Sequence, residues 1–138
     1  MKIGAFIPQG WRMDLNGIPL EDQWDTIIST ANAIEDLNYT SVWVYDHFHT
    51  VPIPTQDPTY ECWSLMAALS QSTSKLRLGQ MCTCNSYRNP SYLTKVASNI
   101  DVMSGGRLEY AIGAGWYDQE YKAYGYNYPT AGIRLKML

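Results

Sequence analysis

A carboxylate and two imidazoles stand close together in Tyr45–His49, where Asp46 and His47 are adjacent and His49 follows two positions later. Histidine titrates near neutral pH, so His47 is a candidate general acid or base for the proton that leaves when a hydride is transferred. The residues alone leave open the alternative that Asp46 caps a loop and His47 packs against it. No further ligand cluster lies nearby, so we do not expect a metal site at His47 and His49.

A second candidate segment is rich in small side chains. Such side chains let the backbone approach a flat ring closely and offer hydrogen bonds to the edge of that ring. The alternative, which composition alone favours, is an ordinary strand-to-helix loop with buried thiols. The residues of this candidate are Met81, Cys82, Thr83, Cys84 and Asn85.

A third candidate is formed by Gly113, Ala114, Gly115 and Trp116. The two glycines allow backbone amides to face a ligand, and the indole can stack on a ring or pack in the core. Asp118 stands where a dinucleotide-binding GxGxxG motif has its third glycine. The segment is therefore only a fragment of that motif and gives little support to a Rossmann site.

Each candidate directly follows a short apolar run of the kind expected for a strand buried on both faces. Helical patterns separate these runs in Glu21–Leu37, around Cys62–Leu69 and behind Pro90, and Gly105-Gly106 ends the third helix. In the first helix the apolar residues fall on one face. Those residues are Trp24, Ile27, Ile28, Ala31 and Ile34. The predicted strands are Lys2–Ile7, Ser41–Tyr45, Leu76–Thr83 and Leu108–Ile112.

Alternation of strands and helices is typical of right-handed βαβ units, so the predicted class is α/β. An open doubly wound sheet and a (β/α)₈ barrel both begin in this way. In either architecture, ligands bind beyond the carboxyl ends of the strands, where all the candidates lie. Gln9–Arg12 follows the first strand and could roof the same pocket, although we expect Trp11 to belong to the core.

The length of the chain sets a further expectation. With 138 residues it has strands for only half of a barrel, which typically needs about 250 residues. Residues 130–138 resemble the start of a helix without a stop signal. We expect a single domain over residues 1–138 that is truncated at its C-terminus.

Composition excludes several classes of partner. The 10 Lys and Arg against 13 Asp and Glu give a net charge of −3, with no basic run to track a phosphate backbone, so nucleic acid is not expected. No apolar stretch approaches the roughly 20 residues that cross a bilayer, and no signal peptide is evident, so we expect a cytoplasmic protein without a membrane partner. The 3 cysteines are spaced unlike a disulfide framework and are expected to be reduced.

Taken together, the segments resemble the luciferase-like monooxygenase superfamily, and within it the branch of oxidoreductases that depend on the deazaflavin coenzyme F-420. The resemblance covers almost the whole chain. It is carried by Ser41–Phe48, Leu78–Pro90, Asp101–Leu108 and Ile112–Trp116, in this order.

The resemblance implies the N-terminal half of a (β/α)₈ barrel and assigns roles within it. Asp46 would contact the deazaflavin ring, and His47 would be the acid or base beside the hydride-bearing carbon. A non-proline cis peptide near Met81-Cys82 would back the ring, and Gly113–Gly115 would lie along it. The sugar-phosphate dehydrogenases of this branch have a glutamate where this chain has Trp116, so a sugar-phosphate substrate is not expected.

Three functions follow as hypotheses. The first is hydride transfer between a deazaflavin coenzyme and a small organic substrate that the sequence does not identify. The second is an oxygen-dependent monooxygenase that uses flavin mononucleotide (FMN), because oxygen activation needs a true flavin. The third is a non-catalytic or inactive fragment. Half a barrel leaves two open sheet edges, which predicts self-association and therefore a homo-oligomer.

Overall fold

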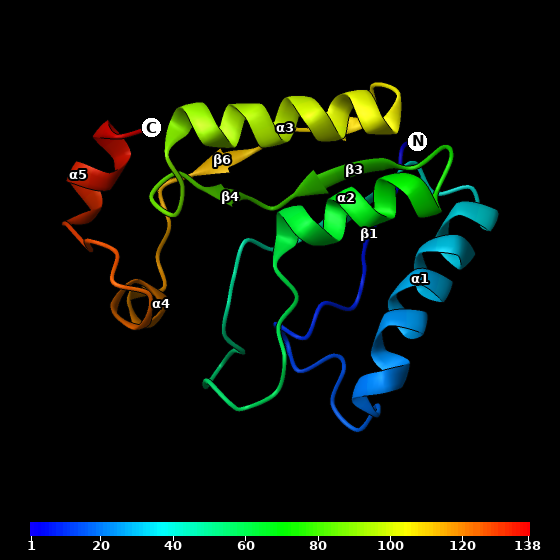
Figure 1. Ribbon diagram of the computed structural model, residues 1–138, viewed down its shortest axis with the longest axis horizontal. Coiled ribbons are helices and arrows are strands. Elements are labelled where there is room, and N and C mark those ends of the chain that lie inside the picture. Colours follow the sequence, from blue (N-terminus) through cyan, green and yellow to red (C-terminus); the bar gives the residue numbers. More distant parts are fainter.

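Strands and helices alternate along the chain, and the computed structural model describes all residues from Met1 to Leu138. Figure 1 shows the short helices α4 and α5 gathered at the side of the molecule to which β4 and β6 lead. The elements are β1 (Gly4–Phe6), α1 (Leu20–Asp36), β2 (Ser41–Val44), α2 (Cys62–Ser72), β3 (Arg77–Gln80), β4 (Thr83–Cys84), α3 (Pro90–Ser104), β5 (Leu108–Glu109), β6 (Ile112–Gly113), α4 (Asp118–Ala123) and α5 (Ala131–Lys136).

The order of the strands decides between the two architectures. One parallel sheet has the order β1-β2-β3-β5, and β4 pairs with β6, also in parallel, in a second sheet. A doubly wound sheet reverses its strand order at a switch point, whereas a barrel adds each strand beside the preceding one. No reversal occurs in this chain. The predicted α/β class is confirmed, and the arrangement is that of part of a (β/α)₈ barrel.

Two of the predicted strands are interrupted. The expectation of a continuous strand over Leu76–Thr83 is wrong at Met81-Cys82, which separates β3 from β4 and whose peptide bond is cis, as the resemblance implied. The strand predicted over Leu108–Ile112 is likewise broken at residues 110–111, between β5 and β6. The breaks lie side by side, because the Thr83 amide donates to the Ala111 carbonyl over 2.9 Å. The strand ends that carry the candidate residues therefore form a two-stranded extension of the sheet.

The main core lies between the sheet and the helices α1, α2 and α3. Helix α1 buries Ile27, Ala31 and Ile34 in it, as the sequence predicts, but Trp24 keeps 38% of its surface exposed at the margin of that face. Val42 of β2 faces the same core. None of the helices combines the length and the apolar character needed to cross a membrane.

Helix α3 begins and ends at the residues that the sequence indicates. The Asn89 side chain accepts hydrogen bonds from the amides of Ser91 and Tyr92, and Pro90 occupies the first turn. Gly105 ends the helix with a φ of 70°, in the left-handed region where glycine is favoured. These caps fix the position of the loop that precedes α3, which carries candidate residues.

Arg107 ties the ends of three elements together. Its guanidinium donates to the carbonyls of Ser70 (2.7 Å), Thr73 (2.9 Å), Leu76 (2.7 Å) and Ser104 (2.7 Å), and to the Thr73 hydroxyl (2.9 Å). These acceptors belong to the end of α2, the segment before β3 and the end of α3. The Arg107 side chain thus fixes the ends of α2 and α3 relative to the start of β3.

We expect Arg107→Met to lower the free energy of unfolding by about 2–3 kcal/mol, because backbone carbonyls then lose a charged donor. The exposed Lys95 of α3 has no side-chain hydrogen bond or ion pair, and Lys95→Met is the matched control, with an expected change within about 0.5 kcal/mol. Urea unfolding followed by circular dichroism measures both. Equal losses in the two variants would contradict this role of Arg107.

Candidate functional site

Segments that are far apart in the sequence line one pocket of about 280 Å³ at the carboxyl ends of the strands. The pocket includes all but two of the site residues expected from the sequence, and it adds Tyr87. Its lining residues are Asp46, His47, Met81, Cys82, Cys84, Tyr87, Gly113, Ala114, Gly115 and Trp116. The three candidate segments thus form one site.

Thr83 and Asn85 are the two expected residues that do not line the pocket. Thr83 is fully buried, and its hydroxyl donates to the side-chain oxygen of Gln80 over 2.7 Å. The Asn85 side chain donates to the Arg134 carbonyl and accepts from the Ser86 hydroxyl. Both side chains support the loop from behind.

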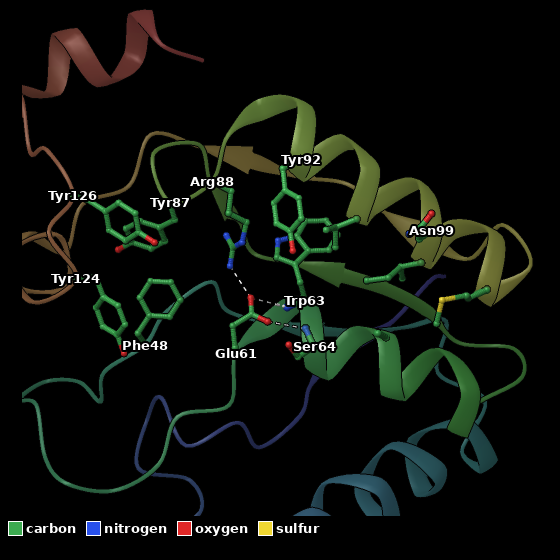
Figure 2. Close-up of a pocket in the computed structure, with 14 residues that line it drawn as sticks. Phe48, Glu61, Trp63, Ser64, Tyr87, Arg88, Tyr92, Asn99, Tyr124 and Tyr126 are labelled. Atoms are coloured by element: carbon green, nitrogen blue, oxygen red, sulfur yellow. Dashed lines mark hydrogen bonds and ion pairs between the residues drawn. The ribbon is translucent and has the colours of Figure 1, made fainter.

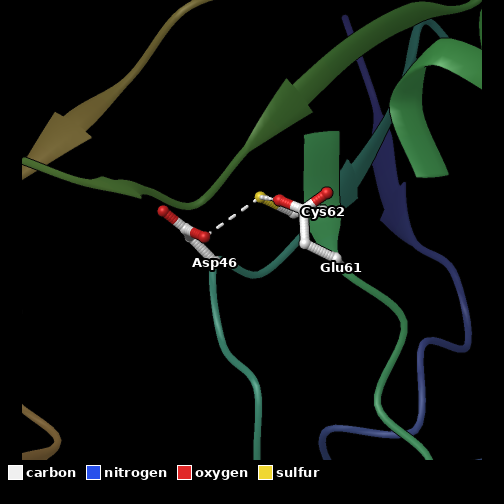
Figure 3. Close-up of side chains that lie close together, drawn as sticks. All are labelled: Asp46, Glu61 and Cys62. Atoms are coloured by element: carbon white, nitrogen blue, oxygen red, sulfur yellow. Dashed lines mark hydrogen bonds between the residues drawn. The ribbon is translucent and has the colours of Figure 1, made fainter. Parts of the chain in front are cut away.

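Asp46 is buried in a cluster of charged and polar groups, and Figure 3 shows it beside Cys62 and Glu61. One carboxylate oxygen accepts from the Cys84 amide (2.8 Å) and from Arg88 Nη1 (2.6 Å), and the other accepts from Arg88 Nη2 (2.8 Å) and from the Cys62 thiol (3.1 Å). Both carboxylate oxygens of Asp46 thus accept hydrogen bonds from within the protein. Asp46 lines the pocket, and the contact with a ring that the resemblance implied stays a prediction.

Arg88 supplies the positive charge of this cluster. It also bonds Glu61 over 2.7 Å, and Asp46, Glu61 and Cys62 hold their ligand atoms within 4.8 Å of one another. Burial opposes the charged form of Arg88, but its hydrogen bonds and attraction to Asp46 outweigh burial and raise the pKa of the guanidinium. Burial raises the pKa of the Cys62 thiol, which therefore stays protonated. The Arg88 guanidinium contacts all three of these groups.

His47 is held by Glu120 of α4. His47 Nδ1 lies 2.8 Å from Glu120 Oε2, and the same carboxylate accepts hydrogen bonds from the amides of Phe48 (2.6 Å) and His49 (2.9 Å) and from the Tyr87 hydroxyl (2.7 Å). The Glu120 side chain is 0% exposed. Burial raises its pKa, but the hydrogen bond and charge of His47 and the two amides lower it further, so that the net pKa is below the ordinary value.

Glu120 was not among the site residues predicted from the sequence. It lies on a six-residue helix that no strong periodicity announces, and its partners are about seventy residues away along the chain. The sequence does contain one indication that Glu120 is buried. Glu120 shares a helical face with Tyr117 and Tyr124, at spacings of three and four residues, and an acidic residue on an aromatic face requires buried partners.

Aromatic rings enclose His47 on its other sides. The Trp11 ring stacks on the imidazole with 4.4 Å between centroids and an interplanar angle of 1°, and the Trp116 ring meets it edge-on at 5.7 Å. Trp11 is buried, as expected of a core residue, and it also forms a wall beside His47. Met81 and Trp116 remain 52% and 58% exposed, so the pocket presents apolar surface next to one imidazole.

Added side-chain bulk would meet close neighbours at both glycines of the pocket, and the constraint is stronger at Gly115 than at Gly113. A Cβ on Gly113 would lie 2.4 Å from the Cys82 sulfur, and a Cβ on Gly115 would lie 2.1 Å from the Tyr121 hydroxyl. Gly115 also has a φ of 70°. Backbone conformation and the buried Tyr121 and Cys84 side chains therefore account for Gly115, whereas only the exposed Cys82 side chain lies against Gly113.

A larger hollow of about 540 Å³ lies on the helix side of the same loops, between α2 and α3. Figure 2 shows Phe48, Tyr87, Tyr124 and Tyr126 grouped at one end and the Glu61–Arg88 pair beside Trp63. Tyr87 lines both this hollow and the smaller pocket. The sequence analysis did not predict the larger hollow.

Residues 1–136 match the sequence family described as luciferase-like monooxygenase. The chain belongs to this family. Over 130 residues it is 26% identical to the pyrimidine monooxygenase RutA of Serratia proteamaculans, covering 91% of the chain and 35% of that protein. The chain spans about a third of the length of this relative.

Two solved structures have the same fold. An F420-dependent secondary alcohol dehydrogenase, in complex with an F420-acetone adduct, matches 99% of the chain and 38% of its own with a TM-score of 0.77 and 27% identity. The oxygenating constituent of 3,6-diketocamphane monooxygenase from Pseudomonas putida, in complex with FMN, matches 91% of the chain and 32% of its own with a TM-score of 0.71 and 20% identity. The structures that share this fold thus include one F420-dependent protein and one in complex with FMN.

Substitution of Gly115 tests how tightly the pocket is packed. Gly115→Ala introduces backbone strain and two close contacts, with the Tyr121 hydroxyl and the Cys84 sulfur at 2.7 Å, and we expect it to lower the free energy of unfolding by about 3 kcal/mol. Gly125 has a similar φ of 74° and open space around it, so Gly125→Ala should cost only about 1 kcal/mol of strain. Chemical denaturation of the two variants compares them, and equal costs would refute the packing argument.

The lowered pKa of Glu120 predicts a loss of stability in acid. A carboxyl group whose pKa is lower in the folded protein stabilises it fully above its ordinary pKa, 4.5, and loses this contribution as the pH falls through the folded value. Unfolding free energies measured between about pH 6 and about pH 3 should fall on the acid side of that range. Glu120→Gln should show a shallower fall, and an unchanged slope would contradict the expectation.

Proposed function

We propose that this chain forms the coenzyme-facing part of an oxidoreductase that transfers a hydride between the deazaflavin coenzyme F-420 and a small organic substrate. The observation that carries the proposal is the pocket itself, where His47 stands between apolar walls at the carboxyl ends of the strands. Such a pocket combines an acid–base group with a surface for a flat ring.

The residues of the pocket suit a flat aromatic group. Met81 and Trp116 line the pocket with exposed apolar side chains, and the segments Cys82–Cys84 and Gly113–Gly115 carry little side-chain bulk. Exposed apolar surface of this kind favours a bound partner. When bound, the deazaflavin supplies the carbon that accepts or donates the hydride.

The chain's own residues would do the remaining work. His47 takes or gives the proton that accompanies the hydride, because its ring lines the pocket and its Nε2 has no partner within the protein. Trp11 covers one face of the imidazole and Trp116 meets its edge, so both rings restrict how the imidazole can turn. Asp46 and Arg88 act indirectly, by holding the Cys84 backbone and the start of α2 in place.

One relative supports the choice of the deazaflavin in this proposal. The structure containing an F420 adduct matches almost the whole chain at 27% identity, whereas the FMN complex, at 20%, supports the fold alone. The alternative of an FMN-dependent monooxygenase is favoured by one observation, the similarity to a pyrimidine monooxygenase over 91% of the chain. The identity of the coenzyme separates the two.

Self-association stays a second prediction about this chain. The strands β1 and β5 lie at the two edges of the four-stranded sheet and have no further partner. Phe6 and Tyr110 are each about half exposed close to these edges. Open edges and apolar surface favour association with another polypeptide, which size-exclusion chromatography over a concentration series measures.

A coenzyme titration tests the proposed function. We expect the intrinsic fluorescence of the chain to change on titration with F-420, with a dissociation constant at least about tenfold lower than for FMN. Ala114→Trp places a bulky ring in the pocket and should abolish binding. Tyr92→Trp, in the larger hollow, is the control and should leave binding unchanged. Preference for FMN would favour the monooxygenase, and binding of neither coenzyme would refute a coenzyme site in this chain.

A further inference from the structure

We infer that Glu120 is a positioning residue for His47: its carboxylate keeps the ring proton on Nδ1, so that Nε2 faces the pocket with a free lone pair. The inference rests on the proposed function for its consequence, since a base must present an unprotonated nitrogen to its proton donor. It concerns a residue that no candidate segment of the sequence contains. Glu120 would thereby select one of the two neutral tautomers of the His47 imidazole.

The hydrogen-bond inventory of Glu120 determines this choice. Oε1 accepts from the amides of Phe48 and His49, which can only donate. Oε2 accepts from the Tyr87 hydroxyl at 2.7 Å and lies 2.8 Å from His47 Nδ1. An ionised carboxylate has no proton to give, so Nδ1 must be the donor in the last contact. Desolvation without these donors would favour the neutral acid, and the four donors together favour the anion.

The position of the ring leaves Nε2 as the free nitrogen. Trp11 stacks on one face of the imidazole, and Glu120 occupies the Nδ1 edge. Nε2 makes no hydrogen bond within the chain and is not buried. Since His47 lines the smaller pocket, this nitrogen is the one that a bound molecule can reach.

The same geometry has a consequence for turnover. If Nε2 carries the lone pair, His47 can take a proton from a substrate, and the anion of Glu120 stabilises the imidazolium that forms. If the proton were instead on Nε2, the neutral ring could only donate toward the pocket. Loss of the Glu120 charge should therefore reduce kcat more than it changes KM or coenzyme affinity.

The first test needs neither coenzyme nor substrate. Nitrogen-15 NMR of the histidine-labelled chain, at a pH where His47 is neutral, reports which nitrogen carries the proton. We expect Nδ1 to be protonated in at least about nine of ten molecules, because a hydrogen bond to a charged acceptor shifts such an equilibrium by roughly tenfold or more. A majority of the Nε2–H tautomer in the unmodified protein would overturn the inference without any variant.

Glu120→Gln gives the second test, with Asp118→Asn as its matched control. A glutamine oxygen can still accept from Phe48 and His49, but its amide group would then point hydrogens at His47 Nδ1, so the ring proton should move to Nε2. Asp118 is on the same helix, is half exposed and pairs with Lys122, so its variant removes one charge from α4 without touching His47. We expect the tautomer to invert in Glu120→Gln alone.

The outcomes separate this inference from the proposed function. An Nδ1–H tautomer together with failure to bind either coenzyme supports the role of Glu120 and refutes the proposed function. Binding of F-420 together with the Nε2–H tautomer supports the proposed function and refutes the role of Glu120. If Glu120→Gln folds and leaves the tautomer unchanged, the inference is overturned.

Discussion

The ion pair between Asp46 and Arg88 is the interaction on which the arrangement of the site depends. Both partners are almost completely removed from solvent, with side-chain exposures of 0% and 11%. A buried carboxylate is tolerated only when charge and hydrogen bonds replace the lost hydration, and Asp46 obtains these from Arg88, the Cys84 amide and the Cys62 thiol. The pair thereby joins the loop after β2, the end of β4 and the segment before α3.

Glu120, which contacts His47, is a second buried carboxylate whose lost hydration is replaced by charge and hydrogen bonds. The Glu120 side chain anchors the short helix α4 to the loop after β2, because the donors to its carboxylate come from that loop and from Tyr87. Helix α4 has six residues and would have little stability alone. Its place in the fold therefore follows from the Glu120 contacts and from Tyr121, which is fully buried among aromatic rings.

Much of the local structure could be predicted because short-range patterns encode it. The apolar runs gave the strands, and Asn89-Pro90 and Gly105 gave the limits of α3. The breaks in the third and fourth strands were not foreseen in full, because the interruption at residues 110–111 depends on the neighbouring break beside it. Thr83 was expected to line the pocket, but its side chain points into the protein. The alternation of side-chain directions along β3 cannot be extended across the break that separates it from β4. Glu120 required knowledge of contacts between distant segments, which a single sequence does not contain.

Tyr87 forms part of the wall between the two hollows on this side of the molecule. One aromatic side chain therefore sets a dimension of both, and it also donates to Glu120. Position 87 cannot be varied to enlarge the outer hollow without enlarging the inner one, and phenylalanine there would keep the shape while removing a donor. The size of both cavities and one hydrogen bond to Glu120 therefore depend on a single residue, and only phenylalanine would change the hydrogen bond without changing the cavities.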